Sequence, residues 1–387
     1  MPPRRIRASV LFICTLLAGC VDPYYPEFED NQKSLVVEAL ITDQPGWQVI
    51  YLSRSSPVNE KGIHAETDAY VSVSDDLGRS SEFMEQDPGA YYAWMTADEL
   101  GTGITYQLHI VTSNGEVYES EPEMFPSPSP SIDSVYWEFE TLGTSDRTES
   151  VNGIRFFLDM EAEADQGRNF RWELVETWEY YSANPITYFY DGILHEWPDA
   201  FSYHTCWNTR KIDEFYIATT RNAESNTIKG FPLNYVSEQS TRLQSRYSLQ
   251  VLQYAVNDEA YDFWKRIQEQ NQESGGIYEV QPDHVGGNMY NMNNEEEDVL
   301  GFFNLCPVSE MRIFVDSVAE LHYPPPDCNL EIIQHPAARP PGMRTPFFLV
   351  SFNSLGVGPP YGVGTHLCFD CRNGGGTIIK PEFWEEK

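Results

Sequence analysis

The chain has 387 residues, of which 41% are hydrophobic and 14% aromatic, so it is long enough for two or three domains and apolar enough to build packed cores. Its 59 acidic and 25 basic residues give a formal net charge of -34. A surface of this charge repels nucleic acid and anionic lipid headgroups, so neither is expected as a binding partner. The apolar fraction also argues against global disorder.

The first residues have the order of a secretory signal. Three arginines precede an apolar run over 8–18, and Leu17-Ala18-Gly19-Cys20 is a lipobox. The run is too short to span a bilayer as a helix. We therefore predict a lipoprotein signal peptide over 1–19 and lipidation of Cys20 by fatty acyl chains such as palmitate. The alternative is an ordinary secretory signal in which the cysteine is coincidental.

Residues 20–33 form an acidic, proline-containing stretch without a regular period, which is typical of a tether. No later stretch is long and apolar enough to cross a membrane, so the lipid is expected to anchor the protein at the bilayer. Acidic residues directly after the cysteine resemble the surface-export signals of Bacteroidota lipoproteins. We therefore expect the outer membrane, on the cell surface, with the periplasmic face as the alternative.

Residues 34–125 contain short alternating segments separated by turn residues, which predict seven strands within one domain. About seven strands in roughly 90 residues is typical of an Ig-like β-sandwich. The predicted strands are 35–41, 49–52, 69–73, 81–84, 91–94, 106–111 and 117–120.

Prolines at alternate positions over 126–131 forbid a helix and predict a stiff linker. The following region, 132–387, is predicted to be a larger β-rich domain with one helix on its side. The helix starts after Asn257, whose side chain can cap it, and presents Tyr261, Trp264 and Ile267 on one face. The predicted strands of this region are 134–141, 154–162, 170–181, 214–220, 247–255, 288–292, 299–305, 311–315 and 347–352.

Five cysteines follow the lipobox, which is an odd number in a compartment that permits disulfides. Two bridges and one free thiol can be paired in several ways, and the spacing does not choose among them. The C-x-x-C at Cys368 and Cys371 could hold zinc or act in redox chemistry, but no second such motif is present, so a structural disulfide is preferred. The disulfide candidates are Cys206, Cys306, Cys328, Cys368 and Cys371.

Several stretches resemble one known family. They are 247–251 with 261–265, 287–291 with 299–303, and the ending Cys368-Phe369-Asp370-Cys371 with 374–377 and 380–384. Together with the lipobox and 35–38, they resemble the Bacteroidota lipoproteins catalogued as domain of unknown function 4249, from Cys20 to Trp384. That family offers no catalytic residue to transfer. The resemblance implies an accessory role beside a TonB-dependent outer-membrane transporter.

Aromatic residues are dense over 170–216, and rings beside acids and amides can bind sugars by stacking. Alternation over 171–179 predicts that most of these rings are buried in a strand, but 188–203 lacks alternation. Tyr188, Tyr190, Trp197 and Tyr203 are therefore the candidates for exposed ligand-binding rings. The oxygen-rich stretch 291–298 is predicted to be a polar turn, with a cation site as the alternative. We expect neither a metal nor a cofactor.

The motifs G-x-S-x-G and H-E-x-x-H are absent from the sequence. The leading hypothesis is therefore a non-catalytic surface lipoprotein that binds a glycan or peptide, or a transporter. The first alternative is an envelope hydrolase or other enzyme acting on a glycan or peptide. The second alternative is an adhesin or assembly component, which would expose a large apolar patch or a free sheet edge.

Overall fold

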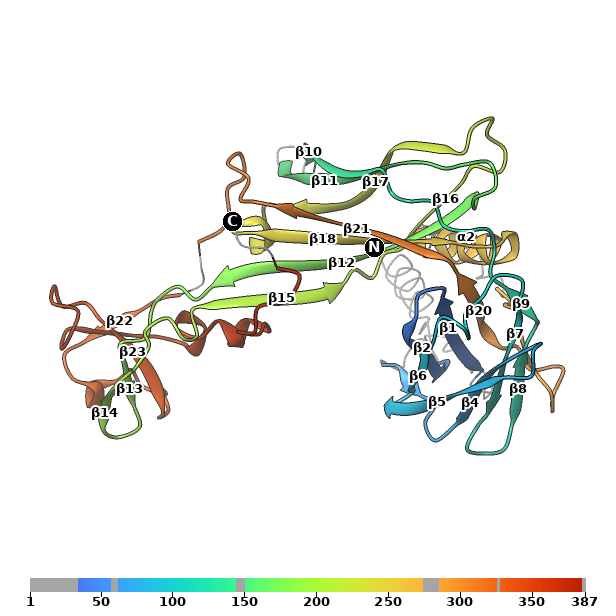
Figure 1. Ribbon diagram of the computed structural model, residues 1–387. Coiled ribbons are helices and arrows are strands. Elements are labelled where there is room, and N and C mark those ends of the chain that lie inside the picture. The colour runs from blue at the N-terminus through green and yellow to red at the C-terminus, as the bar shows by residue number, and fades with distance from the viewer. Residues whose placement is uncertain (1–33, 57–61, 144–149, 274–284, 326–327, 385–387) are drawn as a thin grey trace, which may run out of the picture.

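The computed structural model describes residues 34–56, 62–143, 150–273, 285–325 and 328–384. The described chain is mainly β, with several sheets and one α-helix, as the sequence predicts. Figure 1 shows three parts in a row: an N-terminal sandwich, a central pair of long sheets, and a small lobe at the far end. The predicted signal peptide, the tether and Cys20 lie outside the described residues.

The N-terminal sandwich forms because its strands alternate buried and exposed residues. In β1, Leu35, Val37, Ala39 and Ile41 point inward and are at most 2% exposed. Strands from both ends of the sheet share one core, which gives a sandwich-like arrangement. All seven predicted strands of this part are confirmed. Its strands are β1 (Leu35–Thr42), β2 (Gly46–Arg54), β3 (His64–Ala65), β4 (Tyr70–Asp75), β5 (Ser80–Asp87), β6 (Ala90–Met95), β7 (Thr105–Val111), β8 (Val117–Ser120) and β9 (Glu123–Met124).

Two strands from much later in the chain complete this sheet. β19 (Met289–Asn291) pairs with β8, and β20 (Leu300–Cys306) pairs in parallel with β1. Both segments were predicted to belong to the second domain, but they pair with strands of the N-terminal sheet. The close approach depends on Gly301, because a Cβ there would lie 1.9 Å from the carbonyl oxygen of Val37.

The central part consists of two sheets packed face to face. Phe156 and Leu158 of one sheet share a core with Trp172 and Leu249 of the other. One sheet has β10 (Ser134–Gly143), β11 (Ser150–Glu161) and β17 (Thr227–Ser237). The other has β15 (Thr205–Lys211), β12 (Asn169–Tyr181), β18 (Tyr247–Ala255) and β21 (Val308–Val315), with β16 (Tyr216–Thr219) beside β12. Strand β21 follows β20 after a single residue, so one nearly continuous path crosses from the sandwich into the central sheet.

The predicted helix is α2 (Asp258–Glu273). Its first turn is capped as predicted, because the amide of Ala260 donates to Oδ1 of Asn257 at 2.7 Å. Phe263 packs against Phe302 of β20, with ring centroids 5.3 Å apart. The helix therefore fills the angle between the central sheet and the sandwich.

The far lobe is a five-stranded sheet built from two distant segments. Its strands are β13 (Tyr188–Tyr190), β14 (Leu194–Glu196), β22 (Glu331–Ile333), β23 (Phe347–Ser351) and β24 (Tyr361–Val363). Short 3-10 helices lie at Pro336–Ala338, His366–Cys368 and Cys371–Gly374, and another lies at Thr241–Leu243 near the central sheets.

Two disulfides hold the C-terminal segment. Cys206 of β15 bonds to Cys371, and Cys328 bonds to Cys368. The two cysteines of the C-x-x-C motif thus pair with different partners rather than with each other. Cys306 is free and buried, and burial raises the pKa of its thiol to about 12, which leaves it an unreactive thiol at neutral pH.

The predicted proline linker is packed against the central sheet. Its carbonyl at Pro130 accepts hydrogen bonds from Nε2 of Gln253 and from Oγ of Ser309, both at 2.7 Å. Nearby, Glu123 is 7% exposed and accepts hydrogen bonds at 2.9 Å from the side-chain amides of Asn257 and Asn288. The buried carboxyl of Glu123 therefore lies where the sandwich meets the start of α2 and the segment that leads into β19.

Stability should fall with rising pH because of Glu123. Burial is the main cause that raises the pKa of this carboxyl from 4.5 to about 7, and the carboxylates of Glu259 and Glu121 add to the shift. Because the folded state holds the proton more tightly, the stabilisation is complete below pH 4.5 and is lost as the pH rises to about 7. The loss amounts to about 3 kcal/mol by linkage.

Denaturant titrations between pH 4.5 and 8 check this expectation. The decline in the free energy of unfolding should be smaller by about 3 kcal/mol in Glu123→Gln than in the wild type. Glu138→Gln, at an exposed strand position, should follow the wild-type curve. Parallel curves for the wild type and Glu123→Gln would contradict the assignment.

Candidate functional site

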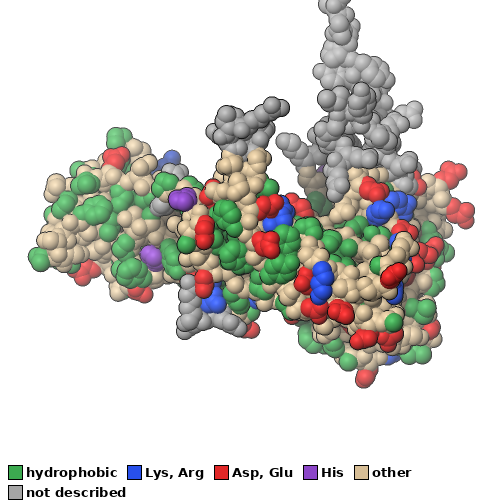
Figure 2. Space-filling view, turned by 90° about the horizontal axis from the view of Figure 1, so that it is seen from above, with side chains coloured by type: hydrophobic (Ala, Val, Ile, Leu, Met, Phe, Trp, Pro, Cys, Tyr) green, Lys and Arg blue, Asp and Glu red, His purple; other side chains and the backbone are tan. Residues whose placement is uncertain are grey.

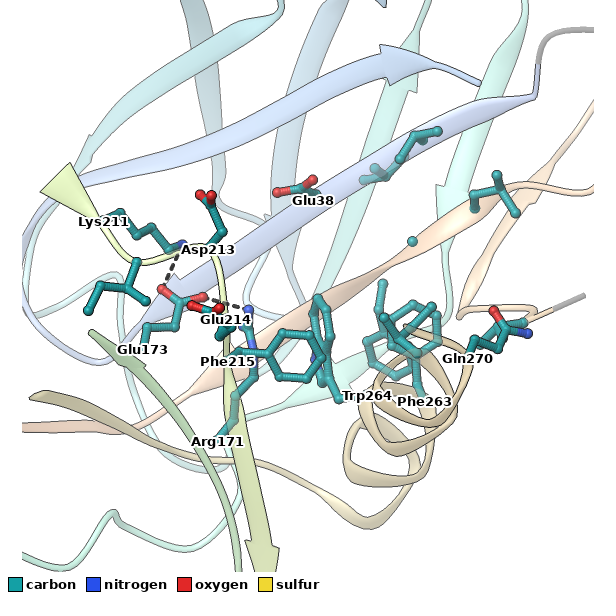
Figure 3. Close-up of a pocket in the computed structure, with 18 residues that line it drawn as sticks. Glu38, Arg171, Glu173, Lys211, Asp213, Glu214, Phe215, Phe263, Trp264 and Gln270 are labelled. Carbon is teal, nitrogen blue, oxygen red and sulfur yellow. Dashed lines mark ion pairs between the residues drawn. The ribbon is translucent and has the colours of Figure 1, made fainter. Parts of the chain in front are cut away.

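A cleft of about 670 Å³ lies where β1 and β20 of the sandwich face the central sheet and α2; we call it the interdomain cleft (Figure 3). This volume is within the range of small-molecule and peptide sites. It is lined by Val36, Val37, Glu38, Arg171, Glu173, Lys211, Ile212, Asp213, Glu214, Phe215, Phe263, Trp264, Ile267, Gln270, Val285, Leu300, Gly301 and Phe302.

An ion-pair chain forms one side of the interdomain cleft. Arg171 and Glu173 lie on the same face of β12 because side chains alternate along a strand, and both are at most 8% exposed. Nη2 of Arg171 lies 2.5 Å from Oε1 of Glu173, whose Oε2 lies 2.8 Å from Nζ of Lys211. One buried carboxylate thus orients two cations, and its own charge is compensated (Figure 3).

Aromatic rings continue this side of the cleft next to Arg171. The Arg171 guanidinium lies 3.9 Å from the ring centroid of Trp264 and 5.3 Å from that of Phe215. Phe263 meets Trp264 edge-on at 5.1 Å. Helix α2 supplies two of these rings, and the turn after β15 supplies the third. The cation is therefore held against rings, which fixes its direction.

Two donors at this site have no hydrogen-bond partner among the described residues. They are Nε of Arg171 and Nε1 of Trp264, and both atoms are buried. An unpaired buried donor costs about 1–3 kcal/mol, and a bound acceptor oxygen would remove that cost. Exposed carboxylates of Glu38, Asp213 and Glu214 surround the opening. The arrangement suits an uncharged or cationic ligand that carries carbonyl or hydroxyl oxygens and an apolar body.

The predicted exposed rings of the far lobe are placed differently. Tyr188 and Tyr190 are 6% and 9% exposed and belong to the core of that lobe, so the prediction of exposure is wrong for them. They alternate with Phe189 in a short strand that pairs with β23, which the sequence pattern did not reveal. Trp197 and Tyr203 are half-buried and pack on each other at 5.6 Å. These four rings do not form an open stacking surface.

The oxygen-rich stretch 291–298 forms the predicted polar turn between β19 and β20. Its oxygens are used within the protein: Oδ1 of Asn291 accepts from the amides of Asn293 and Asn294, and Glu297 accepts from the hydroxyl of Tyr118. Within the described ranges, no group of three or more His, Cys, Asp or Glu side chains is placed to hold a metal ion. No helix in the described part is long and apolar enough to cross a membrane.

The sequence pattern did not reveal the interdomain cleft. The pattern over 171–179 predicted a half-buried strand with its charged residues toward solvent, whereas β12 is buried on both faces over 169–174 and at Glu176 and Thr177. The charged face meets α2 and the sandwich instead of water. The only available signal was an arginine and a glutamate alternating with large apolar residues, which is too common to identify a site.

Across the face in Figure 2, acidic side chains gather mostly over the central sheets and the sandwich, and the far lobe shows fewer. Basic side chains are interspersed among them rather than forming a continuous patch. This distribution agrees with the formal charge of -34.

Comparison with known proteins identifies the family of this chain. Residues 21–312 match the family described as "Domain of unknown function (DUF4249)". No curated protein matches the chain. A solved structure described as trypsin-activated alpha-2-macroglobulin from Escherichia coli is 8% identical, with a TM-score of 0.19. That alignment covers 59% of this chain and 15% of the other, so the chain spans a small part of that protein's length.

The family match ends at residue 312, within β21, and therefore includes the sandwich, the interdomain cleft and α2. Three strands of the far lobe and three of the four bonded cysteines lie beyond it. Because the match extends over more than half of the sequence, the chain belongs to the DUF4249 family.

Proposed function

We propose that this protein is a lipid-anchored binding protein of the outer-membrane surface, with a non-catalytic accessory role beside a TonB-dependent transporter in nutrient uptake. The lipobox and the acidic tether support the anchor. The sandwich follows directly after the tether and would stand between the lipid and the central sheets. In this arrangement the interdomain cleft would present a ligand close to the membrane.

The observation that carries the binding role is the pair of unpaired donors in the interdomain cleft. Nε of Arg171 and Nε1 of Trp264 lie against an apolar wall with an acidic rim. A peptide segment or an uncharged glycan supplies acceptor oxygens without adding negative charge. We therefore propose one of these as the ligand.

Calorimetric titration with neutral and basic oligopeptides and with neutral oligosaccharides tests the binding role. We expect at least one probe to bind, and Trp264→Phe, which keeps a ring but removes the donor, to weaken it about tenfold. Trp94→Phe is the matched control, because that ring is 59% exposed on the outer face of the sandwich. Absence of binding, equal binding by Trp264→Phe, or cleavage of the probes would overturn the proposal.

A second experiment tests the anchor and the partner. The full-length protein, expressed in a bacterium that carries its native envelope, should incorporate an alkyne-labelled fatty acid, and Cys20→Ser should not. Affinity purification in mild detergent should recover a TonB-dependent transporter with the wild type. Unlabelled wild-type protein in the culture fluid would contradict the anchor, and a monomer without the transporter would contradict the partner.

One observation favours the adhesin or assembly alternative. Trp47 and Trp94 face each other across β2 and β6 with ring centroids 5.6 Å apart, and they are 61% and 59% exposed. Tyr51 and Met84 extend the same outer face of the sandwich. An exposed apolar patch of this kind typically marks a protein contact.

The double variant Trp47→Ser/Trp94→Ser separates this alternative from ligand binding. If the patch contacts a partner protein, the double variant should lose recovery of that protein and keep binding in the interdomain cleft. Leu355→Ser, at an 81% exposed position of the far lobe, is the control. Unchanged recovery with the double variant would remove the patch as a contact surface.

A further inference from the structure

A second cleft, of about 640 Å³, opens at the end of the central sheets next to the disulfide-bonded C-terminal segment; we call it the arginine cleft. It lies between the last part of β12, the edge strand β15 and the turn that leads into Thr241–Leu243. Its lining includes Trp178, Tyr180, Arg210, Arg242 and several uncharged amides and hydroxyls such as Gln239 and Thr241.

The charge of the arginine cleft is opposite to that of the protein. Among the described residues that line it, only Arg210 and Arg242 are charged, although the chain carries a net charge of -34. Both arginines bind one carboxylate, Glu176, which is fully buried beneath them. Nε of Arg210 lies 2.6 Å from Oε1, and Nη1 of Arg242 lies 2.7 Å from both carboxylate oxygens. Two positive charges therefore share one negative charge.

These contacts orient the two guanidinium groups without using all their donors. Nε of Arg242 donates to Oγ of Ser240 at 3.2 Å, and Nη1 of Arg242 is used by Glu176. Only Nη2 of Arg242 therefore remains available to a ligand. In the part of the chain that the structure describes, Nη1 and Nη2 of Arg210 and Nη2 of Arg242 have no hydrogen-bond partner. The Arg210 side chain is 57% exposed, so its free edge can reach a ligand. Guanidinium edges of this kind bind a carboxylate through two parallel hydrogen bonds.

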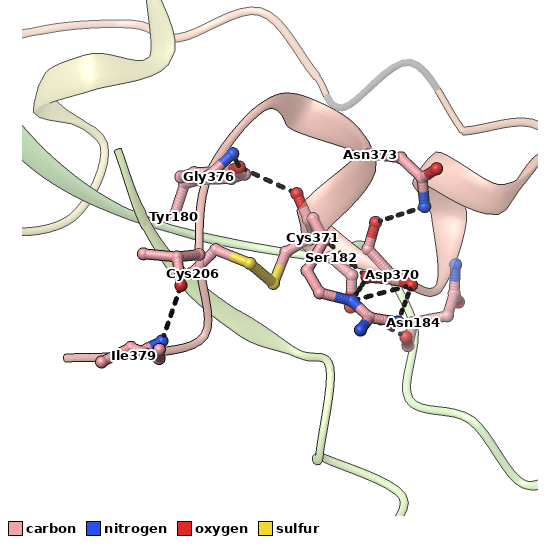
Figure 4. Close-up of a disulfide and its surroundings, with 11 residues drawn as sticks. Tyr180, Ser182, Asn184, Cys206, Asp370, Cys371, Asn373, Gly376 and Ile379 are labelled. Atoms are coloured by element: carbon pink, nitrogen blue, oxygen red, sulfur yellow. Dashed lines mark hydrogen bonds and ion pairs between the residues drawn. A yellow bond between two sulfur atoms is a disulfide. The ribbon is translucent and has the colours of Figure 1, made fainter. Parts of the chain in front are cut away.

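Two aromatic rings, those of Tyr180 and Trp178, form the adjoining wall of the arginine cleft beside the disulfide-bonded segment. The Tyr180 hydroxyl donates to the carbonyl of Cys371 at 2.8 Å and accepts from the amide of Gly376 at 2.9 Å (Figure 4). The disulfide from Cys206 to Cys371 ties this segment to β15. Trp178 lies beneath Arg210, with the guanidinium carbon 5.7 Å from its ring centroid. The wall is thus rigid before any ligand arrives, which lowers the cost of binding.

We propose that the arginine cleft binds a sugar residue that carries a carboxylate, such as a uronic acid within an acidic glycan. The carboxylate would bind the free edges of Arg210 and Arg242. The sugar ring would pack against Trp178 and Tyr180, because aromatic faces attract the C–H groups of a sugar. The remaining lining is rich in uncharged amides and hydroxyls, which both donate to and accept from sugar hydroxyls. A simple anion would use only the arginines.

The arginine cleft is separate from the interdomain cleft and would bind its ligand independently. Arg171 and Glu176 differ by an odd number of positions along β12, so their side chains lie on opposite faces of the central sheet. The two clefts therefore differ in location, in charge and in the ligand they suit. Substitutions in one can be used as controls for the other.

The test is calorimetric titration of the full-length protein in detergent with tetragalacturonate, a neutral galactan tetraose and inorganic sulfate. We expect tetragalacturonate to bind, and Arg210→Ala and Arg242→Ala each to raise its dissociation constant at least tenfold. Arg210→Lys, which keeps the charge but loses the planar edge, should retain only part of the affinity. Arg155→Ala, another arginine paired with one glutamate and stacked on a ring, is the matched control and should bind normally.

The proposal is overturned by any of three results: no binding of tetragalacturonate, equal binding of the neutral tetraose, or sulfate binding as tightly as the sugar acid. Trp264→Phe in the interdomain cleft should leave uronate binding unchanged. A failure of ligand binding in the interdomain cleft can therefore be told apart from a failure of uronate binding in the arginine cleft. Thermal melts of each variant check folding. Arg210→Gln serves as a second variant if Arg242→Ala does not fold, because Arg242 alone already makes two contacts with Glu176.

Discussion

Replacing Cys206 and Cys371 together by alanine is expected to lower the free energy of unfolding by up to about 5 kcal/mol. The bridge joins positions separated by 165 residues, and closing so long a loop removes much of the freedom of the unfolded chain. In the folded state it also ties the C-terminal segment to the edge strand of the central sheet. This is the largest single effect that we expect, and denaturant unfolding without reductant measures it.

Three comparisons make the disulfide prediction specific. Cys328→Ala/Cys368→Ala breaks a bridge that spans 40 residues and should cost about 4 kcal/mol, less than the longer loop. Cys306→Ala removes only a buried free thiol and should have a smaller effect. Dithiothreitol should destabilise the wild type strongly and a variant lacking all four bonded cysteines hardly at all. If reductant left the wild type unchanged, the two bridges would not contribute as described.

Glu176→Ala is expected to destabilise the protein by about 3 kcal/mol, because it leaves Arg242, whose side chain is 20% exposed, without its counter-charge, while solvent screens the 57% exposed Arg210. The carboxylate is fully buried, and it also accepts a hydrogen bond at 2.8 Å from the hydroxyl of Tyr247, which is fully buried as well. Burial, followed by the charge of Glu176, raises the pKa of that Tyr247 hydroxyl well above its ordinary value. The hydroxyl therefore remains a hydrogen-bond donor to Glu176 at neutral pH.

Urea unfolding of the variants measures this effect at neutral pH. Glu176→Gln keeps the shape and one acceptor, and should lie between the wild type and Glu176→Ala. Glu82→Ala, an exposed strand carboxylate on the sandwich, should change stability by less than about 0.5 kcal/mol. Equal stability of Glu176→Ala and the wild type would show that the ion-pair cluster does not stabilise the fold.

Local patterns predicted most strands of the sandwich, most long strands of the central sheets and α2, but not β13, β14, β15, β17, β22 or β24. Alternation in 35–41 identified β1, and the cap at Asn257 with its acidic first turn identified the start of α2. These signals depend on neighbouring residues only. The structure adds β17, which the pattern missed because Gly230 and Pro232 interrupt it. Proline is tolerated there because β17 is the edge strand of its sheet.

Contacts between distant segments could not be predicted in the same way. The parallel pairing of β1 with β20 joins Val36 to Leu300, and no local pattern records which strand lies beside which. Both clefts are formed by such contacts: Arg171 meets Trp264 from another element, and Arg210 meets Arg242 through a shared carboxylate. Each residue alone is typical of a solvated or half-buried position. The disulfide pairing was undecidable for the same reason.

The parallel pair of β1 and β20 also determines how the protein would respond to mechanical force. A pull on the start of β1 acts in one direction, while β20 is held at its other end by its continuation into β21. The two strands would then slide along each other, so the hydrogen bonds between them would share the tension instead of breaking one after another. With the proposed N-terminal anchor, the strand pair that joins the two main parts would in this way resist a pulling force.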